Sequence, residues 1–502
     1  MNSKVSGMLK EPLDPIIQSE MLGPNLIRDF PAALPLITQI NKAHVLMLRQ
    51  QEILTLEQAQ QLAMAILDLE AAGPTAFQLD PGLEDPYFNY EATLIDRVGP
   101  DFGGRVHIAR SRNDLYATMD RLRARSATIV LCKAVLDLRR SLQEQATRHR
   151  AVIMPGYTHL QPAQPVTFGY HLAGFAHGLE RDYQRIVECL RRTNVSPLGA
   201  GAIAGTSFNI DRHATARSLG FDAVSPHAQD CIASRDHLVE LLFVVTMAAT
   251  TLSRMAQDFF VMTTYEFQTL ELPDSVAQTS SMMPQKKNMS ALEVLRACAA
   301  QVLGAHVSAL SGLRATHYSF GFDACCDPFR WTWDALDCGR RAFAVARVVV
   351  EKCKPLPDRA IALTRANFST ATDLADLLVR EAGLSFREAH RLVGDVVRAA
   401  TSRGLTADQI DPELIAEQSS VMLGESINLP ASLVAQAVDP SLVVQARRNT
   451  GGPSEHDMSA MLDGLNSRLA ADCDRLDRMM SQVKEAETVL ERTFRALAGR
   501  AT

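Results

Sequence analysis

The chain has 502 residues and a formal net charge of −6, and it is 47% hydrophobic and 22% charged. These values are ordinary for a globular protein, and the length suffices for roughly two to four domains. Because the chain offers no basic region to neutralise phosphates, we expect no nucleic-acid partner.

Targeting and metal-binding patterns are sparse. Residues 1–15, MNSKVSGMLKEPLDP, lack the apolar core of a signal peptide. The nine cysteines follow no regular spacing, and the 13 histidines show no HExxH pattern. Residues 241–253 are apolar but shorter than a bilayer span, which favours a core helix. We expect a cytoplasmic protein with reduced thiols, no membrane partner, no metal and no cofactor.

Helical patterns run through the chain. At 54–70, Thr55 and Gln58 form a capping-box signature ahead of apolar residues at helical spacing. Further long helices are predicted at 116–150, 166–194, 229–265, 288–313 and 327–353. They are apolar enough to bury more than one face each. Strand alternation is scarce, and the sequence predicts an all-α protein.

The glycine-rich stretch GAGAIAG at 199–205 superficially suggests a dinucleotide-binding loop. No strand pattern leads into it, and no acidic partner for a ribose follows about twenty residues later. A close-packed turn between helices accounts for it better, because glycine and alanine allow backbones to approach closely.

Residues 279–288, TSSMMPQKKN, carry the densest chemical signal. The stretch combines hydroxyls, two cations and amides with no carboxylate, which suits an anion. If a substrate carboxylate lies against Lys286 and Asn288, either Ser280 or Ser281 could meet the carbon beside it. Taken alone, the stretch is more typical of a solvated basic surface loop, because short motif matches are weak evidence.

Two more segments change that balance: HIARSRND at 107–114 and MPGYTHLQPAQP at 154–165. With the serine loop, they resemble motifs of the aspartase/fumarase superfamily and, within it, of the argininosuccinate lyase branch. The resemblance extends in the same order over nearly the whole chain. Its other segments are SPLGAGAIAG (196–205), SRDHLVE (234–240), GLSFREAH (383–390) and RRNTGG (447–452).

The resemblance implies an architecture of three helical domains. An N-terminal helical domain is expected at 1–112, a central bundle of long helices at 113–362, and a C-terminal helical domain at 363–502. The central helices would assemble four chains into one multi-helix core. Each active site would then gather segments from three chains of a homotetramer.

The resemblance also implies a carbon–nitrogen lyase that releases fumarate. Ser280 would be the base that removes a Cβ proton, Lys286 would stabilise the enolate-like aci-carboxylate, and His159 would be oriented by Glu293. Ser281 remains a competing choice for the base. The residues implied in substrate binding are Arg112, Asn113, Thr158, Gln161, Ser281, Met283 and Asn288.

The chain departs from the family pattern in segments that the resemblance associates with recognition of the leaving amine. Argininosuccinate lyases carry a stretch like YNKDLQEDK after the serine-loop helix, where this chain reads HYSFGFDACCDPF at 317–329, and EDPY at 84–87 replaces EDxH. Met289 follows Asn288 in place of proline. An aromatic and anionic amine pocket could come from a set of five residues, Tyr87, Phe320, Phe322, Asp323 and Asp327.

With these departures the chain resembles lyases that act on aminopolycarboxylates, and this resemblance implies an N-substituted aspartate such as ethylenediamine-N,N′-disuccinate (EDDS) as substrate. The first alternative is argininosuccinate, cleaved to arginine and fumarate. An alternative of another class is a crystallin-like structural protein without activity, because the same fold serves that purpose in lenses.

Overall fold

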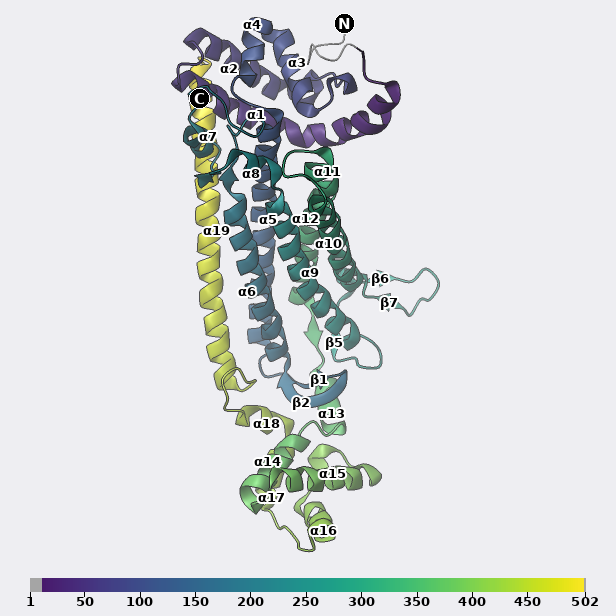
Figure 1. The fold of residues 1–502 in the computed structure, drawn as a ribbon. Coiled ribbons are helices and arrows are strands. Elements are labelled where there is room, and N and C mark those ends of the chain that lie inside the picture. The colour runs from purple at the N-terminus through teal and green to yellow at the C-terminus, as the bar shows by residue number, and fades with distance from the viewer. Residues whose placement is uncertain (1–10, 501–502) are drawn as a thin grey trace.

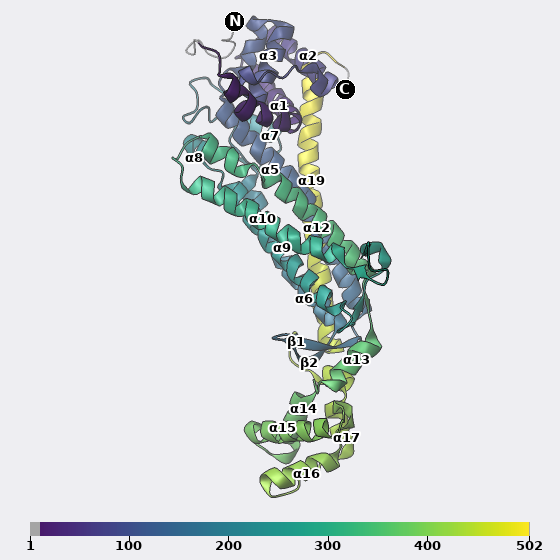
Figure 2. The same cartoon turned by 90° about the vertical axis from the view of Figure 1, so that its right-hand side faces the viewer.

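The computed structural model describes residues 11–500 as an elongated, almost wholly helical protein (Figure 1). Long helices run along the main axis, one group of helices covers the upper end, and a small helical unit lies at the lower end. A quarter turn shows the same three levels in the same order (Figure 2). The predicted all-α fold is confirmed.

The upper end contains the first helices of the chain. A π-helical turn at Ile17–Leu22 leads into α1, and the capping box predicted at Thr55 and Gln58 is present at the start of α2. The helices of this region are α1 (Gly23–Gln50), α2 (Leu56–Ala72), α3 (Pro86–Val98) and the short α4 (Pro100–Gly103). They share one hydrophobic core, to which the far end of the chain contributes Phe494.

Five long helices build the central bundle. They are α5 (Arg112–Arg148), α6 (Phe168–Thr193), α9 (Asp236–Met262), α10 (Ser290–Arg314) and α12 (Thr332–Lys352). Each corresponds to a segment predicted as a long helix, although α5 begins four residues before the predicted start at 116. One prediction needs correction, because 229–265 is not continuous: α8 (Ala228–Ala233) ends before α9 begins. Ser234 between them is extended, and Arg235 turns its guanidinium inward.

Short strands occur only as pairs. The hairpin of β1 (Ile153–Thr158) and β2 (Gln161–Thr167) lies below the bundle, and β6 (Gln278–Thr279) pairs with β7 (Lys287–Asn288) at the base of the serine loop. The other pairs are β3 (Val195–Ser196) with β4 (Ala223–Val224) and β5 (Leu270–Glu271) with β8 (Lys354–Pro355). Two short helices, α7 (Arg212–Ser218) and α11 (Phe322–Cys325), complete the upper half.

The lower unit follows the bundle. It begins after α13 (Pro357–Ala366), and it contains α14 (Ala371–Ala382), α15 (Phe386–Ser402), α16 (Pro412–Leu423), α17 (Ala431–Val438) and α18 (Pro440–Ala446). Its core, from Leu374 to Val438, is separate from the cores above.

The last helix, α19 (Glu455–Leu497), leaves the lower unit and runs back to the upper end (Figure 1). Its first half packs Leu462 and Leu469 into the bundle core, and its end packs Leu490 and Phe494 into the upper core. The domain boundaries at 112 and 362 stay predictions, but residues 363–502 do not share one hydrophobic core.

Two helices of the bundle, α9 and α10, are long and apolar enough to cross a membrane by length and composition alone. Within the most apolar 18 residues of each helix, only 50% of α9 and 28% of α10 is buried inside the chain. Large side chains therefore stay exposed: Phe243 and Met247 on α9, and Val294, Leu303, Val307 and Leu310 on α10. These helices pack against each other, so the exposed side chains form outward apolar faces.

Candidate active site

The three segments predicted to form the site lie at different levels of one chain. Arg112 begins α5 at the upper end, whereas His159 lies in the β1–β2 hairpin, beyond the lower end of α5. Because an α-helix rises 1.5 Å per residue, the length of α5 separates them by about 50 Å. The serine loop projects from the side of the bundle (Figure 1). One chain therefore does not bring the predicted residues together.

Arg112 and Asn113 are the first two residues of α5. Ser111 caps the helix and forms a capping box with Asp114, which fixes the direction in which both side chains leave the backbone. The Arg112 Nη1 donates to Glu84 and Asp85 at 2.8 and 2.7 Å, and the guanidinium lies 4.0 Å from the centre of the Phe88 ring. Arg112 is thus already held by two carboxylates.

The glycine-rich stretch positions Asn113. Gly199 and Gly201 donate their N–H groups to the buried carboxylate of Asp114 at 2.9 and 3.0 Å, and Ala202 accepts a hydrogen bond from the Asn113 amide at 3.2 Å. Gly201 has a φ of +61°, and a Cβ there would meet the Gly205 oxygen at 2.6 Å. The predicted close-packed turn is confirmed. Burial raises the pKa of Asp114 to about 6 despite these donors.

Sequence reasoning assigned no role to Asp114, although its capping-box position next to the RSRN residues could have pointed to it. Arg110, four residues before Asp114, is buried, and it donates to the hydroxyl of Tyr87 at 3.0 Å. Tyr87 also bonds His107 at 2.8 Å.

His159 occupies the tip of the β1–β2 hairpin. Thr158 pairs with Gln161, so His159 and Leu160 form a two-residue turn, with φ values of +54° and +55°. Such a turn requires two left-handed residues and normally takes asparagine or glycine, which makes a histidine here costly for the backbone. His159 is exposed, as are Thr158 and Gln161 on either side of the turn. Strain at an exposed histidine favours a role in chemistry over a role in packing.

The serine loop forms a compact turn above the short β6–β7 pair. The Ser280 Oγ accepts hydrogen bonds from the backbone N–H groups of Met282 and Met283, at 3.3 and 3.0 Å. These are turn contacts, because the following helix begins only at Ser290. Ser281, by contrast, is exposed and has no hydrogen bond from its side chain to any residue in 11–500. Two N–H donors aimed at the Ser280 oxygen would favour its anion.

The two lysines of the loop differ. The Lys287 Nζ donates to the Leu272 carbonyl at 2.5 Å and pairs with Asp274 at 2.8 Å, so it ties down the base of the loop. Lys286 is exposed, and no described carboxylate lies within ion-pair distance of its ammonium group. Lys286 is therefore the cation available to a ligand. Asn288 makes one long contact, 3.5 Å from its amide to the Thr279 carbonyl.

Glu293 lies in the first turn of α10 and is exposed. The expected pairing with His159 is not made within one chain: among residues 11–500, His159 and Glu293 share neither a hydrogen bond nor an ion pair. Met283 is also exposed, at 41% of its surface, next to the Ser280 turn. The predicted residues of the hairpin are exposed, whereas in the serine loop Ser280 and Asn288 are half-buried and Ser281, Met283 and Lys286 are exposed.

Arg112 and Asn113 line a cavity of about 280 Å³ at the upper end of the bundle. It lies between α1, the start of α5 and the segment 320–333. Of the five residues expected to form an amine pocket, Phe320, Phe322 and Asp327 line the cavity. Tyr87 and Asp323 do not, since Tyr87 is buried under Arg110. The segment that replaces DLQEDK therefore does face the predicted carboxylate-binding residues.

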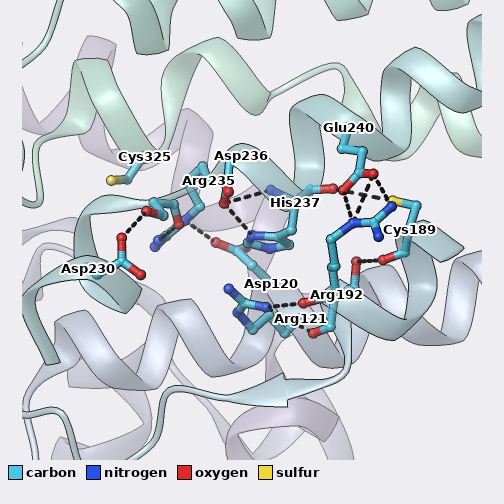
Figure 3. Close-up of polar contacts among 12 residues, drawn as sticks. Asp120, Arg121, Cys189, Arg192, Asp230, Arg235, Asp236, His237, Glu240 and Cys325 are labelled. Carbon is cyan, nitrogen blue, oxygen red and sulfur yellow. Dashed lines mark hydrogen bonds and ion pairs between the residues drawn. The ribbon is translucent and has the colours of Figure 1, made fainter. Parts of the chain in front are cut away.

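Arg235 of the SRDHLVE motif lines this cavity, and Figure 3 shows the polar contacts around the motif. The buried Arg235 donates from Nε to Asp120 at 2.9 Å and from Nη1 to the carbonyls of Ile232 and Ser234. His237 is fully buried, and burial together with Arg121 and Arg235 lowers its pKa well below the ordinary value. Arg192 and Glu240 form an ion pair at the edge of the cluster. These contacts hold the motif in place, so its role is structural.

Within residues 11–500, no group of three or more histidine, cysteine or acidic side chains is arranged to hold a metal ion. The arrangement instead supplies a serine with two N–H donors, a free lysine, an exposed histidine, and a cavity with charges of both signs. These groups are suited to proton removal next to a carboxylate and to stabilisation of the resulting anion.

Comparison with known proteins decides the family. Residues 36–304 match the family described as Lyase, and residues 368–444 match Argininosuccinate lyase C-terminal. The chain is 36% identical over 481 residues to argininosuccinate lyase 1 of Shouchella clausii (strain KSM-K16), with 96% of this chain and 97% of the relative covered. The chain belongs to the argininosuccinate lyase branch of the aspartase/fumarase superfamily. It is a fumarate-releasing carbon–nitrogen lyase.

Similarities within the branch point to more than one activity. The argininosuccinate lyase of Methanothermobacter thermautotrophicus is 36% identical over 429 residues, covering 86% of this chain and 91% of the relative. EDDS lyase in complex with formate superposes with a TM-score of 0.88 at 32% identity, and 97% of each chain is covered. A two-substitution variant of EDDS lyase with bound fumarate has the same TM-score and identity, covering 98% of this chain and 97% of that one.

Proposed function

We propose that this lyase cleaves an N-substituted aspartate of the aminopolycarboxylate type, such as EDDS, into fumarate and an amine. The observation that carries the proposal is the cavity beside Arg112 and Asn113, lined by Phe320, Phe322 and Asp327. It provides aromatic faces and a carboxylate where a leaving amine with cationic nitrogens would lie.

The reaction requires a base that removes a proton from Cβ and a group that stabilises the resulting anion. A Cβ–H bond and the Cα–N bond break, a C=C bond forms, and the amine leaves with a proton. The hydrogen to be removed is weakly acidic, so the enolate-like aci-carboxylate formed on its removal must be stabilised. Preorganised donors and cations at the developing charge are usually the largest contribution to such a step.

Ser280 acts as the base. A serine hydroxyl is a weak base unless its anion is stabilised, and the N–H groups of Met282 and Met283 supply two donors to its oxygen. These contacts favour Ser280 over Ser281. Lys286 then adds a positive charge, and Lys286 and Asn288 bind the carboxylate next to the carbon that loses its proton.

Arg112, Asn113 and Thr158 bind the second carboxylate of the succinyl group. Asn113 is oriented by Ala202, and Arg112 keeps Nη2 for an anion while Nη1 bonds Glu84 and Asp85. His159 protonates or polarises the leaving amine, with Glu293 orienting its ring and Gln161 supporting it. Met283 borders the substrate from the serine loop.

The site forms in a homotetramer from three chains. The length of α5 keeps Asn113 and His159 of one chain about 50 Å apart, so they can meet one substrate only through different copies. The exposed apolar faces of α9 and α10 supply the surface for that assembly. In this arrangement a monomer is inactive.

Argininosuccinate is the second candidate substrate. The identity of 36% over almost the entire length of an argininosuccinate lyase favours it. The segment 317–329 counts against it, because it lacks the DLQEDK pattern that the resemblance associates with the arginine end. A crystallin-like protein without activity is not proposed, since the candidate base, cation and histidine are all present and accessible.

The reverse reaction tests the proposal. Fumarate is mixed with ethylenediamine or with arginine, its absorbance is followed, and products are identified by mass. An adduct with ethylenediamine and none with arginine supports an aminopolycarboxylate substrate. An adduct with arginine alone identifies argininosuccinate as the substrate instead.

A further inference from the structure

Two arginines that line the cavity, Arg123 and Arg330, have no hydrogen-bond or ion-pair partner for their guanidinium groups among residues 11–500; Arg330 is exposed, and Arg123 is the more buried of the two. Arg123 of α5 is half-buried and lines the cavity, with its guanidinium 4.1 Å from the centre of the Trp333 ring of α12. No hydrogen bond or ion pair reaches this guanidinium from any residue in 11–500. Burial lowers the pKa of Arg123, which marks a charge that is short of compensation.

The nearby acids are already engaged. Asp120, three residues before Arg123 on α5, accepts from Arg235 at 2.9 Å (Figure 3). Asp29 of α1 pairs with its neighbour Arg28 at 2.8 Å. Asp334 raises the pKa of Arg123 only from beyond ion-pair distance. Arg123 therefore faces the cavity as a positive charge without a carboxylate of its own.

Arg123 is aligned with the predicted carboxylate-binding end. Arg112, Tyr116, Met119 and Arg123 line the cavity at spacings of four, three and four residues, which places them on one face of α5. Eleven residues of helix separate Arg112 from Arg123 by about 16 Å along the axis. Helical side chains tilt towards the N-terminus of the helix, so the Arg123 side chain leans towards Arg112, and a ligand of roughly 10 to 15 Å with an anionic group at each end would span the two.

We propose that Arg123, stacked on Trp333, binds a carboxylate carried by the leaving amine, at the end of the cavity opposite Arg112 and Asn113. The inference rests on the proposed function and narrows its substrate class. The preferred substrate is then an N-substituted aspartate whose amine portion bears an acidic group, and ethylenediamine still adds to fumarate but with a higher KM than its carboxylated counterpart. The planar guanidinium can grip the carboxylate with two parallel hydrogen bonds.

A purely structural role for Arg123 would be different in its effects. Stacking on Trp333 ties α5 to α12, and loss of that contact would affect every substrate to the same degree. A carboxylate-binding role affects only substrates that carry the distal carboxylate, and it changes KM more than kcat. The two roles are therefore distinguished by pairs of amines that differ only in that group.

The experiment measures addition of each amine to fumarate. N-(2-Aminoethyl)aspartate is compared with ethylenediamine, and arginine with agmatine, which is arginine without its carboxylate. Arg123→Met is expected to raise KM for the carboxylated member of the active pair by about 10- to 100-fold, as for loss of a hydrogen bond to a charged group. The KM of the partner without the carboxylate and both kcat values stay within about twofold of the original protein.

Control variants separate the explanations. Arg140→Met removes an exposed arginine from the same helix and leaves all four KM values unchanged. Arg123→Lys keeps the charge and retains part of the preference, and circular dichroism confirms that each variant is folded. Equal changes for both members of a pair, or no preference for the carboxylated amine in the original protein, would overturn the Arg123 assignment. If the original protein adds none of the four amines, the proposed function itself fails.

Discussion

Mixing two inactive variants should restore activity. Asn113→Ala removes a carboxylate ligand at the upper end of α5, and His159→Asn removes the proton donor about 50 Å away, beyond its lower end. In the proposed tetramer, each site draws these residues from different chains. In an equal mixture, a site is intact when one donor chain keeps Asn113 and the other keeps His159. Each condition holds in half of cases, so about one quarter of sites are active.

The assay is steady-state fumarate formation after the two variants are denatured together and refolded. Each variant refolded alone gives the background. Each variant refolded with an equal amount of unaltered protein should give about half of full activity. Only one of the two residues is then substituted, and half of the chains that donate it to a site carry the substitution. Size-exclusion chromatography verifies that the assembly is retained in all samples.

The reasoning is refuted if the mixture shows only the sum of the two backgrounds while the controls reach half. That result would mean that Asn113 and His159 act on one substrate from the same chain. The separation along α5 would then have to be overcome by a large rearrangement of the bundle.

Ser280→Ala should lower kcat by about 10² to 10⁴-fold, as for loss of a positioned base, with the circular dichroism spectrum and assembly unchanged; turnover close to the original would rule out Ser280 as the base. Lys286→Ala should cost about 3 kcal/mol of transition-state stabilisation, measured in kcat, whereas Lys287→Ala, which loosens only the base of the loop, should cost less. A rise in KM alone for Lys286→Ala would assign it to binding. The pKa of His237 lies well below 6.5 in the folded protein, so folding is favoured above that pH and the free energy of unfolding falls as the pH drops below 6.5. Urea unfolding should show a shallower decline for His237→Phe, and an unchanged slope would contradict this.

Helix periodicity and capping signals predicted α2 and the five long helices of the bundle, but not α1, α19 or the helices of the lower unit. The box of Thr55 and Gln58 and the long bundle helices could be predicted because they depend on local spacing. The break at Ser234 could not, because Arg235 turns inward to reach Asp120, a residue far away in the sequence. The course of α19 also depends on tertiary contacts, since its end packs Phe494 into a core formed by the first helices.

The candidate site, like the fold, could be predicted from the sequence only in part. Motif resemblance singled out Ser280 and Lys286, but only the structure distinguishes Lys286 from Lys287 by the contacts that Lys287 makes at the base of the loop. Asp114 was missed as a ligand of the glycine loop because its partners lie 85 residues or more away. Arg123 has no motif around it. Arg123 is a candidate ligand-binding residue because its guanidinium has no hydrogen-bond or ion-pair partner among the described residues, and no sequence pattern can reveal that.

The most direct test of the central claim is the ratio of kcat/KM values for fumarate release from EDDS and from argininosuccinate, measured on the purified protein under one set of conditions. We predict that EDDS is the better substrate, because Phe320, Phe322 and Asp327 line the place of its amine and the segment 317–329 lacks the DLQEDK pattern. A higher value for argininosuccinate would contradict the substrate assignment while leaving the family and the shared site in place. Release from neither would contradict the account of the cavity itself.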